Sequence, residues 1–379
     1  MLASFLLDRL LANGFRRYSG VPCSILKPLI NCVIDSPAAD FLPATVEGEA
    51  AAYAAGTWLA GEPAVVMLQN SGLGNIVNPY TSLLATYRIP ALFLVTWRGE
   101  PGGSDAAQHR IMGELTLPLL ETLGISRVVL EDSEAGLADA VSRAEESVRR
   151  QERSFAIVLR RGLFEPRKLE AIERLSRETS TECATLGDEA DLPARWDAVQ
   201  VISEHTAGHP VISSTGYNSR EFFNAGDRPS NFYMQGSMGF ALPIALGVAA
   251  CRPGPVFCVD GDGSVLMRVG GLATAGAKCR GNLTYILLDN GVHDSTGAQA
   301  TVSGNVRFDR LADAMGFDLF FRVNNVNELP AAIERCSRED GTGFIHVPIA
   351  AGTAEAMKRP DTSPAEIARR FAKFLGGEA

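Results

Sequence analysis

The chain has 379 residues, a length that suits two α/β domains of the usual size. Its hydrophobic fraction of 46% and charged fraction of 21% are those of an ordinary globular protein. The formal net charge of -9 argues against a general nucleic-acid surface and against a surface for anionic membranes. An anionic substrate would therefore have to meet a local cluster of cations.

The seven cysteines are spread along the chain without a CxxC pair, which indicates a reduced, cytoplasmic location rather than a disulfide framework. The segment from Leu2 to Leu11 has the apolar spacing of an amphipathic helix, and Asp8 and Arg9 interrupt it as they would not interrupt a signal peptide. Because no run of 18 apolar residues occurs, we expect no membrane span.

The first half alternates apolar runs with amphipathic stretches, which is typical of a doubly wound parallel sheet. The expected strands are Arg17 to Val21, Phe41 to Val46, Ala64 to Leu68, Ile89 to Val95, Ser126 to Leu130 and Ser154 to Leu159. The expected helices are Ser24 to Ile34, Glu47 to Gly56, Ile76 to Leu84, Thr116 to Leu123 and Glu134 to Arg150, with Ser24 and Thr116 as candidate caps.

Two polar segments follow strands of this half, at the sheet edge where open α/β sheets bind ligands. The first is the Gly-rich turn that contains Asn70 and Ser71. The second, Thr96 to Arg110, is long and without periodicity, and such loops are often functional. Its Arg98 is a candidate partner for a dianionic group, or a solvated surface charge, and its His109 has no apolar core in which to be buried.

Polar and acidic residues dominate from position 167 to about 195. We therefore predict a first domain of residues 1–166, a linker of residues 167–195 and a second α/β domain of residues 196–379. Expected strands of the second domain are Pro210 to Ser213, Val256 to Val259, Leu283 to Leu288, Leu319 to Val323 and Phe344 to Val347. Expected helices are Arg195 to Ala207, Leu266 to Lys278, Phe308 to Phe317, Glu328 to Arg338 and Pro364 to Phe374.

Acidic and amide residues end two of these strands. Val256 to Val259 is followed by Asp-Gly-Asp-Gly-Ser, and Leu283 to Leu288 by Asp-Asn-Gly. A right-handed crossover through the intervening helix puts both strand ends at one edge of a parallel sheet, so Asp262 and Asn290 are predicted neighbours.

An Asp carboxylate, an Asn amide oxygen and a backbone carbonyl form a partial set of hard oxygen ligands, which suits Mg²⁺ shared with a phosphate. Gly261, Gly263 and Ser264 would let backbone N–H groups approach that phosphate closely. The alternative interpretation is that this segment is only a strand-to-helix turn.

The GDGS segment followed by the Asn of an Asp-Asn pair resembles the signature of thiamine-diphosphate enzymes. The resemblance implies that Mg²⁺ is held against the cofactor's diphosphate by Asp262, Asn290 and the carbonyl oxygen of Val292. It also implies two α/β domains, one for the cofactor's pyrimidine and one for its diphosphate.

Glu47 opens an Ala-rich stretch and, taken alone, is a first-turn carboxylate favoured by the helix dipole. In the enzymes that this chain resembles, such a helix begins with a Glu, followed by a Gly at the spacing of Gly56, and that Glu bonds the cofactor's aminopyrimidine. The resemblance implies that Glu47 is the proton-handling group and partly buried, with Glu49 as a supporting or solvated neighbour.

A second Gly-punctuated segment, Asn231 to Pro243, precedes an Ala/Leu helix. Gly236 and Ser237 are expected at the cofactor's phosphates. Met238 is either core filler, the usual role of such a Met, or, as the resemblance implies, the apolar wedge that bends the bound cofactor.

The resemblance covers essentially the whole chain and extends to phosphonopyruvate decarboxylases and the related sulfopyruvate decarboxylases. It is carried by GVPCSILKPLIN, QNSGLGNIVNP, WRGEPG, DNGVHDSTGAQ and HVPIA. It implies the decarboxylation of 3-phosphonopyruvate to phosphonoacetaldehyde and CO₂ in phosphonate biosynthesis, dependent on thiamine diphosphate and Mg²⁺. The implied substrate-binding residues are Asn70, Ser71, Arg98 and Arg220, and the implied protonating groups are His109 and His293.

The chain departs from that family's pattern at three places, which are DAAQH for DEPQH, GYNSRE for GKTSRE and Phe240 for His. These departures affect loops expected at the substrate's tail. The alternatives are a sulfopyruvate decarboxylase, a related carboligase, or a cofactor-binding subunit without catalysis. The resemblance further implies a homo-oligomer, a dimer or larger, with the cofactor at the subunit interface.

Overall fold

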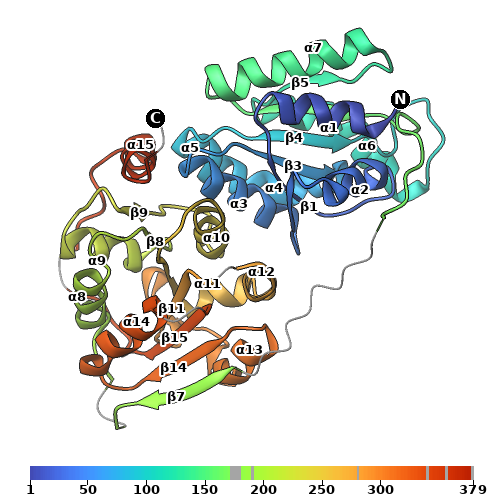
Figure 1. The fold of residues 1–379 in the computed structure, drawn as a ribbon. Coiled ribbons are helices and arrows are strands. Elements are labelled where there is room, and N and C mark those ends of the chain that lie inside the picture. The colour runs from blue at the N-terminus through green and yellow to red at the C-terminus, as the bar shows by residue number, and fades with distance from the viewer. Residues whose placement is uncertain (171–180, 189–191, 280, 339–340, 355–356, 377–379) are drawn as a thin grey trace. The chain divides into compact units, whose positions relative to one another are not determined.

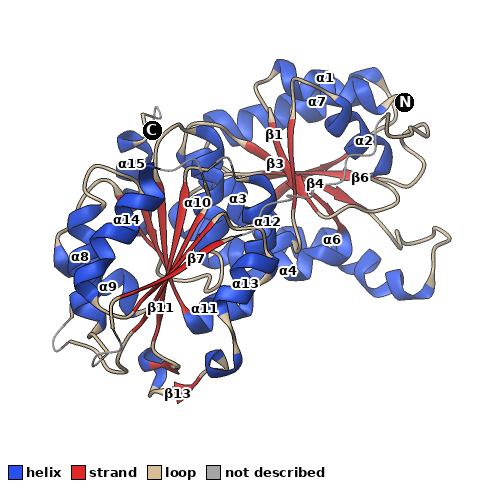
Figure 2. Ribbon diagram, turned by 60° about the horizontal axis from the view of Figure 1, so that its bottom comes forward, coloured by secondary structure: helices blue, strands red, loops and turns tan. Residues whose placement is uncertain are grey.

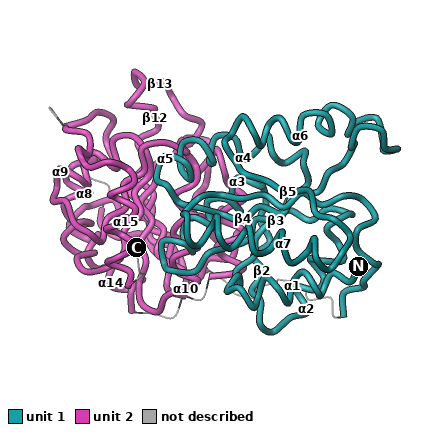
Figure 3. Tube along the Cα trace, turned by 90° about the horizontal axis from the view of Figure 1, so that it is seen from above, with its two compact units in different colours: residues 1–174 teal, residues 175–379 magenta. Residues whose placement is uncertain are grey.

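The structure is a computed structural model, and it describes the chain except for residues 171–180, 189–191, 280, 339–340, 355–356 and 377–379. The chain divides into two compact units, Met1–Arg174 and Leu175–Ala379 (Figure 3). This division falls inside the segment 167–195 that the composition suggests as a linker.

The first unit is built on a six-stranded parallel sheet (Figure 1). In sheet order its strands are β2 (Asp40–Pro43), β1 (Arg17–Gly20), β3 (Ala64–Gln69), β4 (Leu92–Thr96), β6 (Phe155–Leu159) and β5 (Ser126–Val129). The central strands β3, β4 and β6 are apolar and buried on both faces, as strands of a parallel sheet between two helical layers must be.

Helices cover both faces of this sheet (Figure 2). One layer consists of α1 (Ala3–Ala12), α2 (Lys27–Asp35) and α7 (Glu134–Glu145), whose apolar residues form one core with β1, β3, β4 and β6. The other contains α3 (Glu47–Leu59), α4 (Leu73–Pro79), which continues through a π-helical segment (Tyr80–Leu84) into α5 (Ala85–Tyr87), and α6 (Arg110–Thr122). This alternation confirms the doubly wound architecture predicted from the sequence.

Helix α3 is buried on almost every side. Its residues from Ala50 to Ala55 are all apolar, and all but Tyr53 have a side chain of a single methyl group. A helix with such a composition can approach β1, β3 and α4 closely, which fixes the position of its first residue, Glu47.

Two predicted caps are wrong. Helix α2 begins at Lys27 behind Leu26, and Ser24 lies in the preceding turn. Helix α6 begins at Arg110 instead of Thr116, because Thr116 is fully buried inside the helix, where its hydroxyl donates to the Met112 carbonyl oxygen at 2.5 Å. An i to i-4 hydrogen bond of this kind lets a Thr sit within a helix.

The second unit is built on a seven-stranded parallel sheet. In sheet order its strands are β7 (Glu182–Leu186), β14 (Leu319–Val323), β15 (Gly343–Pro348), β11 (Leu283–Asp289), β10 (Val256–Gly261), β8 (Val211–Ser213) and β9 (Asn231–Tyr233). Strand β7 lies in the segment that we expected to be a linker, yet it pairs with β14 from Glu182 to Leu186. Strand β9 was also not predicted, since its three residues precede a Gly-rich turn.

The helices of the second unit also form two layers (Figure 2). Their bounds are α8 (Arg195–His205), α9 (Tyr217–Ala225), α10 (Ala241–Cys251), α11 (Asp262–Met267), α12 (Gly270–Lys278), α13 (Phe308–Ala314), α14 (Leu329–Arg338) and α15 (Pro364–Phe374). The single crossover helix expected between β10 and β11 is therefore two helices, α11 and α12. A capping box of Ser363 and Glu366 starts α15. Within the described residues, none of the helices combines the length and apolar character needed to cross a bilayer.

Candidate active site

The carboxyl edge of β10 and β11 carries the predicted ligands. The two strands are parallel neighbours with Gly261 opposite Leu288, as predicted. Asp262 directly follows β10 and Asn290 directly follows β11. Both side chains line one pocket, together with Val292, and these are the three residues predicted to provide metal ligands.

The same pocket contains most of the predicted cofactor-binding residues. Gly261, Gly263, Ser264 and Met238 line it, as does His293. Gly236 and Ser237 precede Met238, and Ser237 is buried with the left-handed φ of 54°, which is uncommon for a residue with a side chain. Backbone strain of this kind occurs where the surrounding structure requires one conformation.

Asn290 is oriented by a carboxylate. Its amide nitrogen Nδ2 donates to Asp294 Oδ2 at 2.6 Å. Because an ionised carboxylate only accepts hydrogen bonds, the NH₂ group must face Asp294, and this leaves Oδ1 on the opposite side of the amide. Asn290 Oδ1 accepts only a long bond of 3.3 Å, from the Val292 backbone N–H. An acceptor oxygen is thereby presented at the strand end.

Asp294 belongs to a buried charged network. Arg195 donates to Asp294 Oδ2, and its other terminal nitrogen lies 3.4 Å from Glu221 Oε1. All three side chains are at most 6% exposed. One guanidinium thus faces two buried carboxyls, and burial raises the pKa of Glu221 to about 7, although Arg195 opposes this shift. Glu221 Oε2 is buried without a hydrogen-bond partner among the described residues, as suits a carboxyl that holds a proton.

Asp262 is 3% exposed and accepts a hydrogen bond on Oδ2 from the Thr301 hydroxyl. Thr301 in turn donates its backbone N–H to the Gly291 carbonyl oxygen at 2.8 Å. The loop after β11 therefore returns to the Asp262 carboxylate, which ties the two strand ends together. In the described part of the chain, Asp262 Oδ1 has no hydrogen-bond partner.

Asp289, the last residue of β11, is held by three donors. His346 Nε2 lies 3.0 Å from Oδ2, and Oδ1 accepts from the Ser303 hydroxyl at 2.9 Å and from the Gly291 N–H at 3.3 Å. These bonds keep the pKa of the Asp289 carboxyl below its usual value although burial acts in the opposite direction. Asp289 thus fixes the backbone next to Asn290.

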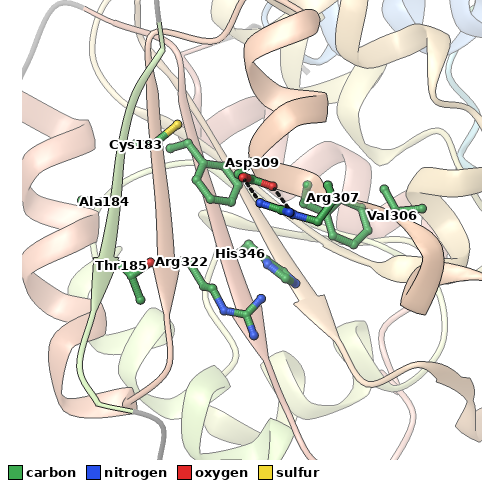
Figure 4. A pocket seen from close by; sticks show the side chains of 10 residues that line it. Cys183, Ala184, Thr185, Val306, Arg307, Asp309, Arg322 and His346 are labelled. Carbon is green, nitrogen blue, oxygen red and sulfur yellow. Dashed lines mark hydrogen bonds and ion pairs between the residues drawn. The ribbon is translucent and has the colours of Figure 1, made fainter.

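The imidazole of His346 also borders a second pocket on this sheet, shown in Figure 4. The in-register pairs Thr185 with Arg322 and Arg322 with His346 place these residues side by side on three neighbouring strands. Arg307 at the rim is already paired with Asp309 at 2.7 Å. Asp309 thus offsets one of the two arginines that line this pocket.

Below the pocket, Asp260 is fully buried and burial raises the pKa of its carboxyl. It accepts from the Tyr285 hydroxyl at 3.1 Å and from the Gly261 N–H at 2.9 Å. The Ser264 hydroxyl accepts from the Gly239 N–H at 3.0 Å, which connects the segment of Met238 to the turn after β10. Ser264 is thus engaged with the protein through its side chain.

Gly263 leaves room for the ring of His293. A Cβ added there would lie 2.3 Å from Cε1 of the His293 ring, so the ring packs directly on the backbone of the turn. The structure therefore brings His293 next to Asp262, as the prediction of a catalytic role requires.

In the first unit, Glu47 is 9% exposed at the start of α3. Asn75 Nδ2 donates to Glu47 Oε2 at 2.7 Å. A Cβ at Gly72 would lie 2.3 Å from Glu47 Oε1, so the Gly in the turn after β3 leaves room for the carboxylate in this position. The expected partial burial of Glu47 is confirmed, and Asn75 and Gly72 are partners that the sequence alone did not identify.

Glu49 is not solvated. It is 2% exposed and its Oε2 accepts from the Thr45 hydroxyl at 2.5 Å and the Thr45 backbone N–H at 2.7 Å. Both donors belong to Thr45 in the segment before α3, so Glu49 fastens that segment to the first turn of the helix that carries Glu47. Of the two interpretations of Glu49, the supporting one agrees with this geometry.

Asn70, predicted to bind substrate, is fully buried and uses its amide on the protein. Nδ2 donates to the Arg98 carbonyl oxygen and to the Thr116 hydroxyl, both at 2.8 Å, and Oδ1 accepts from the Arg98 N–H at 3.2 Å. Asn70 therefore fastens the loop after β4 to the turn after β3. Ser71 is exposed and accepts from Gln69 Nε2 at 2.7 Å.

Arg98 is neutralised by a bidentate ion pair. Its Nε and NH2 groups donate to the two carboxylate oxygens of Asp105 at 2.7 and 2.6 Å. The pair holds the pKa of the Asp105 carboxyl well below its usual range. The loop does contain His109, which is half-buried in a short turn before α6 and whose carbonyl oxygen packs against Gly99.

Arg220, the second cation predicted for the substrate, does not line the pocket that holds Asp262 and Asn290. Its guanidinium lies over the ring of Tyr217, 5.0 Å from the centroid, and Tyr217 itself borders the pocket. The contact of Arg220 with the substrate stays a prediction.

Several supporting residues had no signal in the sequence. Asp294 stands two positions after Val292 and was one acidic residue among many, and Arg195 only begins a helix. Their pairing across 99 positions is visible only in the fold. The sequence feature that could have drawn attention to Arg195 is a cation at the first residue of an expected helix, directly after an acidic segment.

The buried Glu221 gives a testable pH dependence. Because its pKa is raised in the folded state, the folded protein retains a proton that the unfolded chain loses, so its stability falls as the pH rises from about 4.5 to about 7. Glu221→Gln removes this loss, and its stability relative to wild type should rise by about 1 to 3 kcal/mol between pH 5 and pH 8. Denaturant midpoints at four pH values measure it.

The exposed Glu204→Gln substitution in the neighbouring helix is the matched control, and its difference from wild type should not depend on pH. A constant difference between Glu221→Gln and wild type from pH 5 to pH 8 would contradict a raised pKa at this site.

Comparisons with known proteins agree with the geometry of both units. Residues 214–347 match the family model of the thiamine pyrophosphate enzyme C-terminal TPP-binding domain. A solved structure from Mycobacterium smegmatis, described as a thiamin diphosphate-dependent enzyme, superposes with a TM-score of 0.69. It covers 93% of this chain and 99% of that chain at 14% identity, which supports the fold alone.

Curated relatives match along the whole chain. It is 42% identical over 375 residues to the phosphonopyruvate decarboxylase of Streptomyces viridochromogenes, covering 98% of this chain and 94% of the relative. It is 29% identical over 378 residues to the sulfopyruvate decarboxylase of Methanosarcina acetivorans, covering 96% and 95%. The resemblance found in the sequence is therefore confirmed, and the chain belongs to the phosphonopyruvate decarboxylase family of thiamine-diphosphate enzymes.

Proposed function

We propose that this protein catalyses the decarboxylation of 3-phosphonopyruvate to phosphonoacetaldehyde and CO₂ with thiamine diphosphate and Mg²⁺, as a cytoplasmic step in phosphonate biosynthesis. The observation that carries the proposal is the 42% identity to a phosphonopyruvate decarboxylase over nearly the full length of both chains. Glu47 adds to it, because a cofactor-binding subunit without catalysis would need Asp262 and Asn290 for the metal but would not need a proton-handling carboxyl at position 47. All seven cysteines are free thiols, which suits a reduced compartment.

The donor set at the carboxyl edge of β10 and β11 fits Mg²⁺. Asp262 has one carboxylate oxygen held by Thr301 and the other without a hydrogen-bond partner among the described residues. Asn290 presents Oδ1 because Asp294 holds its Nδ2. With the carbonyl oxygen of Val292, these are hard oxygen ligands, and Mg²⁺ usually completes such a partial set with phosphate oxygens and water.

The segments around this set fit a diphosphate. Gly261 and Gly263 have no side chains, and the pocket that they line also contains Ser264 and Met238. We assign Gly236, Ser237, Gly261, Gly263 and Ser264 to the phosphates and Met238 to the apolar support of the cofactor. Bound thiamine diphosphate supplies the electron sink that decarboxylation requires.

Glu47 is the proposed proton-handling group. Asn75 holds Oε2, and Oε1 has no hydrogen-bond partner in the described part of the first unit, so it is free to take and return a proton. A carboxyl that is 9% exposed exchanges protons with a neighbouring group more readily than with bulk water. We assign the aminopyrimidine of the cofactor as that neighbour.

His293 is the stronger of the two candidates for protonating the product. It lines the pocket of Asp262 and Asn290, and its ring is fixed against the backbone of Gly263. His109 lies in a half-buried turn of the first unit. We retain His109 as a second candidate because its loop also contains Arg98.

The activity test is CO₂ release with thiamine diphosphate and Mg²⁺ from 3-phosphonopyruvate, sulfopyruvate and pyruvate. We expect selective turnover of 3-phosphonopyruvate, and Glu47→Gln should lower kcat by at least about 100-fold while cofactor binding persists, since an amide cannot take the proton. Glu134→Gln, an exposed carboxylate at the start of α7, is the control. Turnover of sulfopyruvate alone, a condensation product in place of the aldehyde, or full activity of Glu47→Gln would contradict the proposal.

The orientation of Asn290 predicts the effect of Asp294→Asn. An amide at position 294 can face Asn290 with either its oxygen or its NH₂ group, so Asn290 is no longer forced to present Oδ1. The affinity for a divalent cation should fall by about 10-fold, as is common when a partner of a metal ligand is replaced. Mn²⁺ titration followed by electron paramagnetic resonance measures it without turnover.

Asp309→Asn is the matched control for that experiment, because Asp309 also pairs with an arginine in the same unit but contacts none of the proposed ligands. Equal Mn²⁺ affinities of wild type and Asp294→Asn would show that Asn290 does not depend on Asp294.

We also propose a homo-oligomer in which Glu47 of one subunit and Asp262 of another act on the same cofactor molecule. Glu47→Gln and Asp262→Asn would then complement each other, because a hetero-dimer of the two variants contains one site with both native residues. The purified hetero-dimer should have about half of the wild-type activity, whereas each variant alone is inactive. No activity in the hetero-dimer would mean that both residues of a site come from one chain.

A further inference from the structure

The two cations predicted for the anionic tail of the substrate are both engaged. Arg98 forms a bidentate pair with Asp105, and Arg220 lies over Tyr217. Withdrawing Arg98 from that pair would leave Asp105, whose side chain is 9% exposed, without its main partner. A dianionic tail would therefore need cations besides Arg98.

The first unit contains a pocket that meets this requirement. Four cationic side chains and one hydroxyl group line it, and we call it the basic pocket: Ser24, Lys27, Arg161, Arg167 and Lys168. Its other lining residues are apolar or glycine, and no carboxylate is among them. In a chain with a formal net charge of -9, such a lining is a local reversal of charge.

Two of these cations lack a counterion. In the part of the chain that the structure describes, neither Lys27 nor Lys168 forms an ion pair or hydrogen bond through its ammonium group. Arg161 is 3.9 Å from Asp105 Oδ1, an oxygen that Arg98 already engages at 2.6 Å. Arg167 pairs with Asp35 at 3.0 Å and with Glu170 at 3.1 Å, and its Nε is buried without a hydrogen-bond partner among the described residues.

The position of the basic pocket is that of a ligand site. Ser24 follows β1 and Arg161 follows β6, so the pocket lies at the carboxyl edge of the first sheet. Glu47 and Asn70 follow β2 and β3 at the same edge. The pocket and the proposed catalytic group therefore share one edge of one sheet.

Hydrogen bonds connect the basic pocket to this edge. Arg98 NH1 lies 3.4 Å from the Ser24 hydroxyl, and the Arg98 backbone is bonded on both sides to the Asn70 amide. Asn70 begins the turn whose Gly72 packs against Glu47. The Arg98–Asp105 pair thus works as a brace between the two places, which explains why it is not free for a ligand.

We propose that the basic pocket binds a tetrahedral dianion, the phosphonate group of the substrate, through Lys27, Arg161 and Lys168. This inference rests on the proposed function for the identity of the substrate, while the affinity for a dianion follows from the pocket alone. Ammonium and guanidinium groups around a phosphonate make charge-assisted hydrogen bonds to its three oxygens. The cavity volume of about 510 Å³ is within the range of small-molecule sites.

The kinetic test uses the holoenzyme and single substitutions Lys27→Met, Arg161→Met and Lys168→Met. Each should raise the KM for 3-phosphonopyruvate by about 10-fold and leave kcat within about twofold, because the lost contact binds substrate and transition state equally. Residual turnover of pyruvate, which has no charged tail, should not change. Lys27→Arg should restore most of the affinity, and the exposed Lys373→Met in the second unit is the control.

Binding of inorganic phosphate, measured by calorimetry without substrate, separates the pocket from the reaction. Wild type should bind phosphate, each Met variant should bind it about 10-fold more weakly, and phosphate should compete with 3-phosphonopyruvate. Phosphate that binds in the pocket without competing would identify free phosphate as the ligand and overturn the assignment to the substrate's tail.

The two proposals fail separately. If wild type turns over 3-phosphonopyruvate but the three substitutions change neither KM nor phosphate binding, the basic pocket is not a ligand site and the proposed function stands. If phosphate binding is lost in the variants but wild type releases no CO₂ from 3-phosphonopyruvate, the pocket binds a dianion and the proposed reaction is wrong.

Discussion

An ionised carboxylate can only accept hydrogen bonds. At Asp294 this restriction sets the orientation of the Asn290 amide at the end of β11, and the candidate site of the second unit depends on that orientation. Facing Asp294, the Asn290 amide must turn its NH₂ group inward and its oxygen outward. Arg195 forms an ion pair with the buried Asp294, and Glu221 lies on the other side of the guanidinium. The orientation of a proposed metal ligand is therefore set by residues that are not themselves proposed to bind the metal. The arrangement costs stability, since two buried carboxyls share one cation, and a proton on Glu221 relieves that cost below a pH of about 7.

A similar division between bracing and binding is found in the first unit. Glu49 holds the segment before α3, Asn75 holds one oxygen of Glu47, and Gly72 leaves room for the other. These contacts come from the segments that follow β2 and β3. The two strands lie on either side of β1, so both segments begin at the same edge of the sheet. The backbone near Glu47 is thus fixed by neighbouring side chains, and Gly72 leaves space beside the carboxylate. Only Oε2 of Glu47 is engaged among the described residues, so Oε1 stays available. Rigid surroundings of this kind keep a catalytic group in position without using its reactive atom.

The fold, and the position of Asp262 and Asn290 at one edge of the sheet, could be predicted from the sequence because their signals are local or depend only on strand order. The alternation of apolar runs predicts a parallel sheet, and the acidic ends of β10 and β11 then place Asp262 beside Asn290. The supporting contacts were beyond prediction, since Arg195 and Asp294 are 99 positions apart and neither has a distinctive neighbourhood. Thr116 was misassigned as a cap because a buried Thr bonded to its own helix has the same sequence pattern as a cap. The β7 strand was missed because exposed, polar edge strands lack the apolar signal.

Whether a cation is available to a ligand depends on whether it already forms an ion pair with a carboxylate of the protein. If Arg98 moved to bind a ligand, the Asp105 carboxylate would lose its ion-pair partner, and the link that Arg98 forms between Ser24 and Asn70 would be broken. Lys27 and Lys168 form no ion pair with any described residue, so their full charge is available to a ligand. The attraction between such cations and a ligand scales with the charge of the ligand, which favours a dianionic phosphonate over a monoanionic sulfonate of similar shape. Discrimination between two tetrahedral tails therefore does not require a difference in shape; it requires cations that the protein has left without a carboxylate partner.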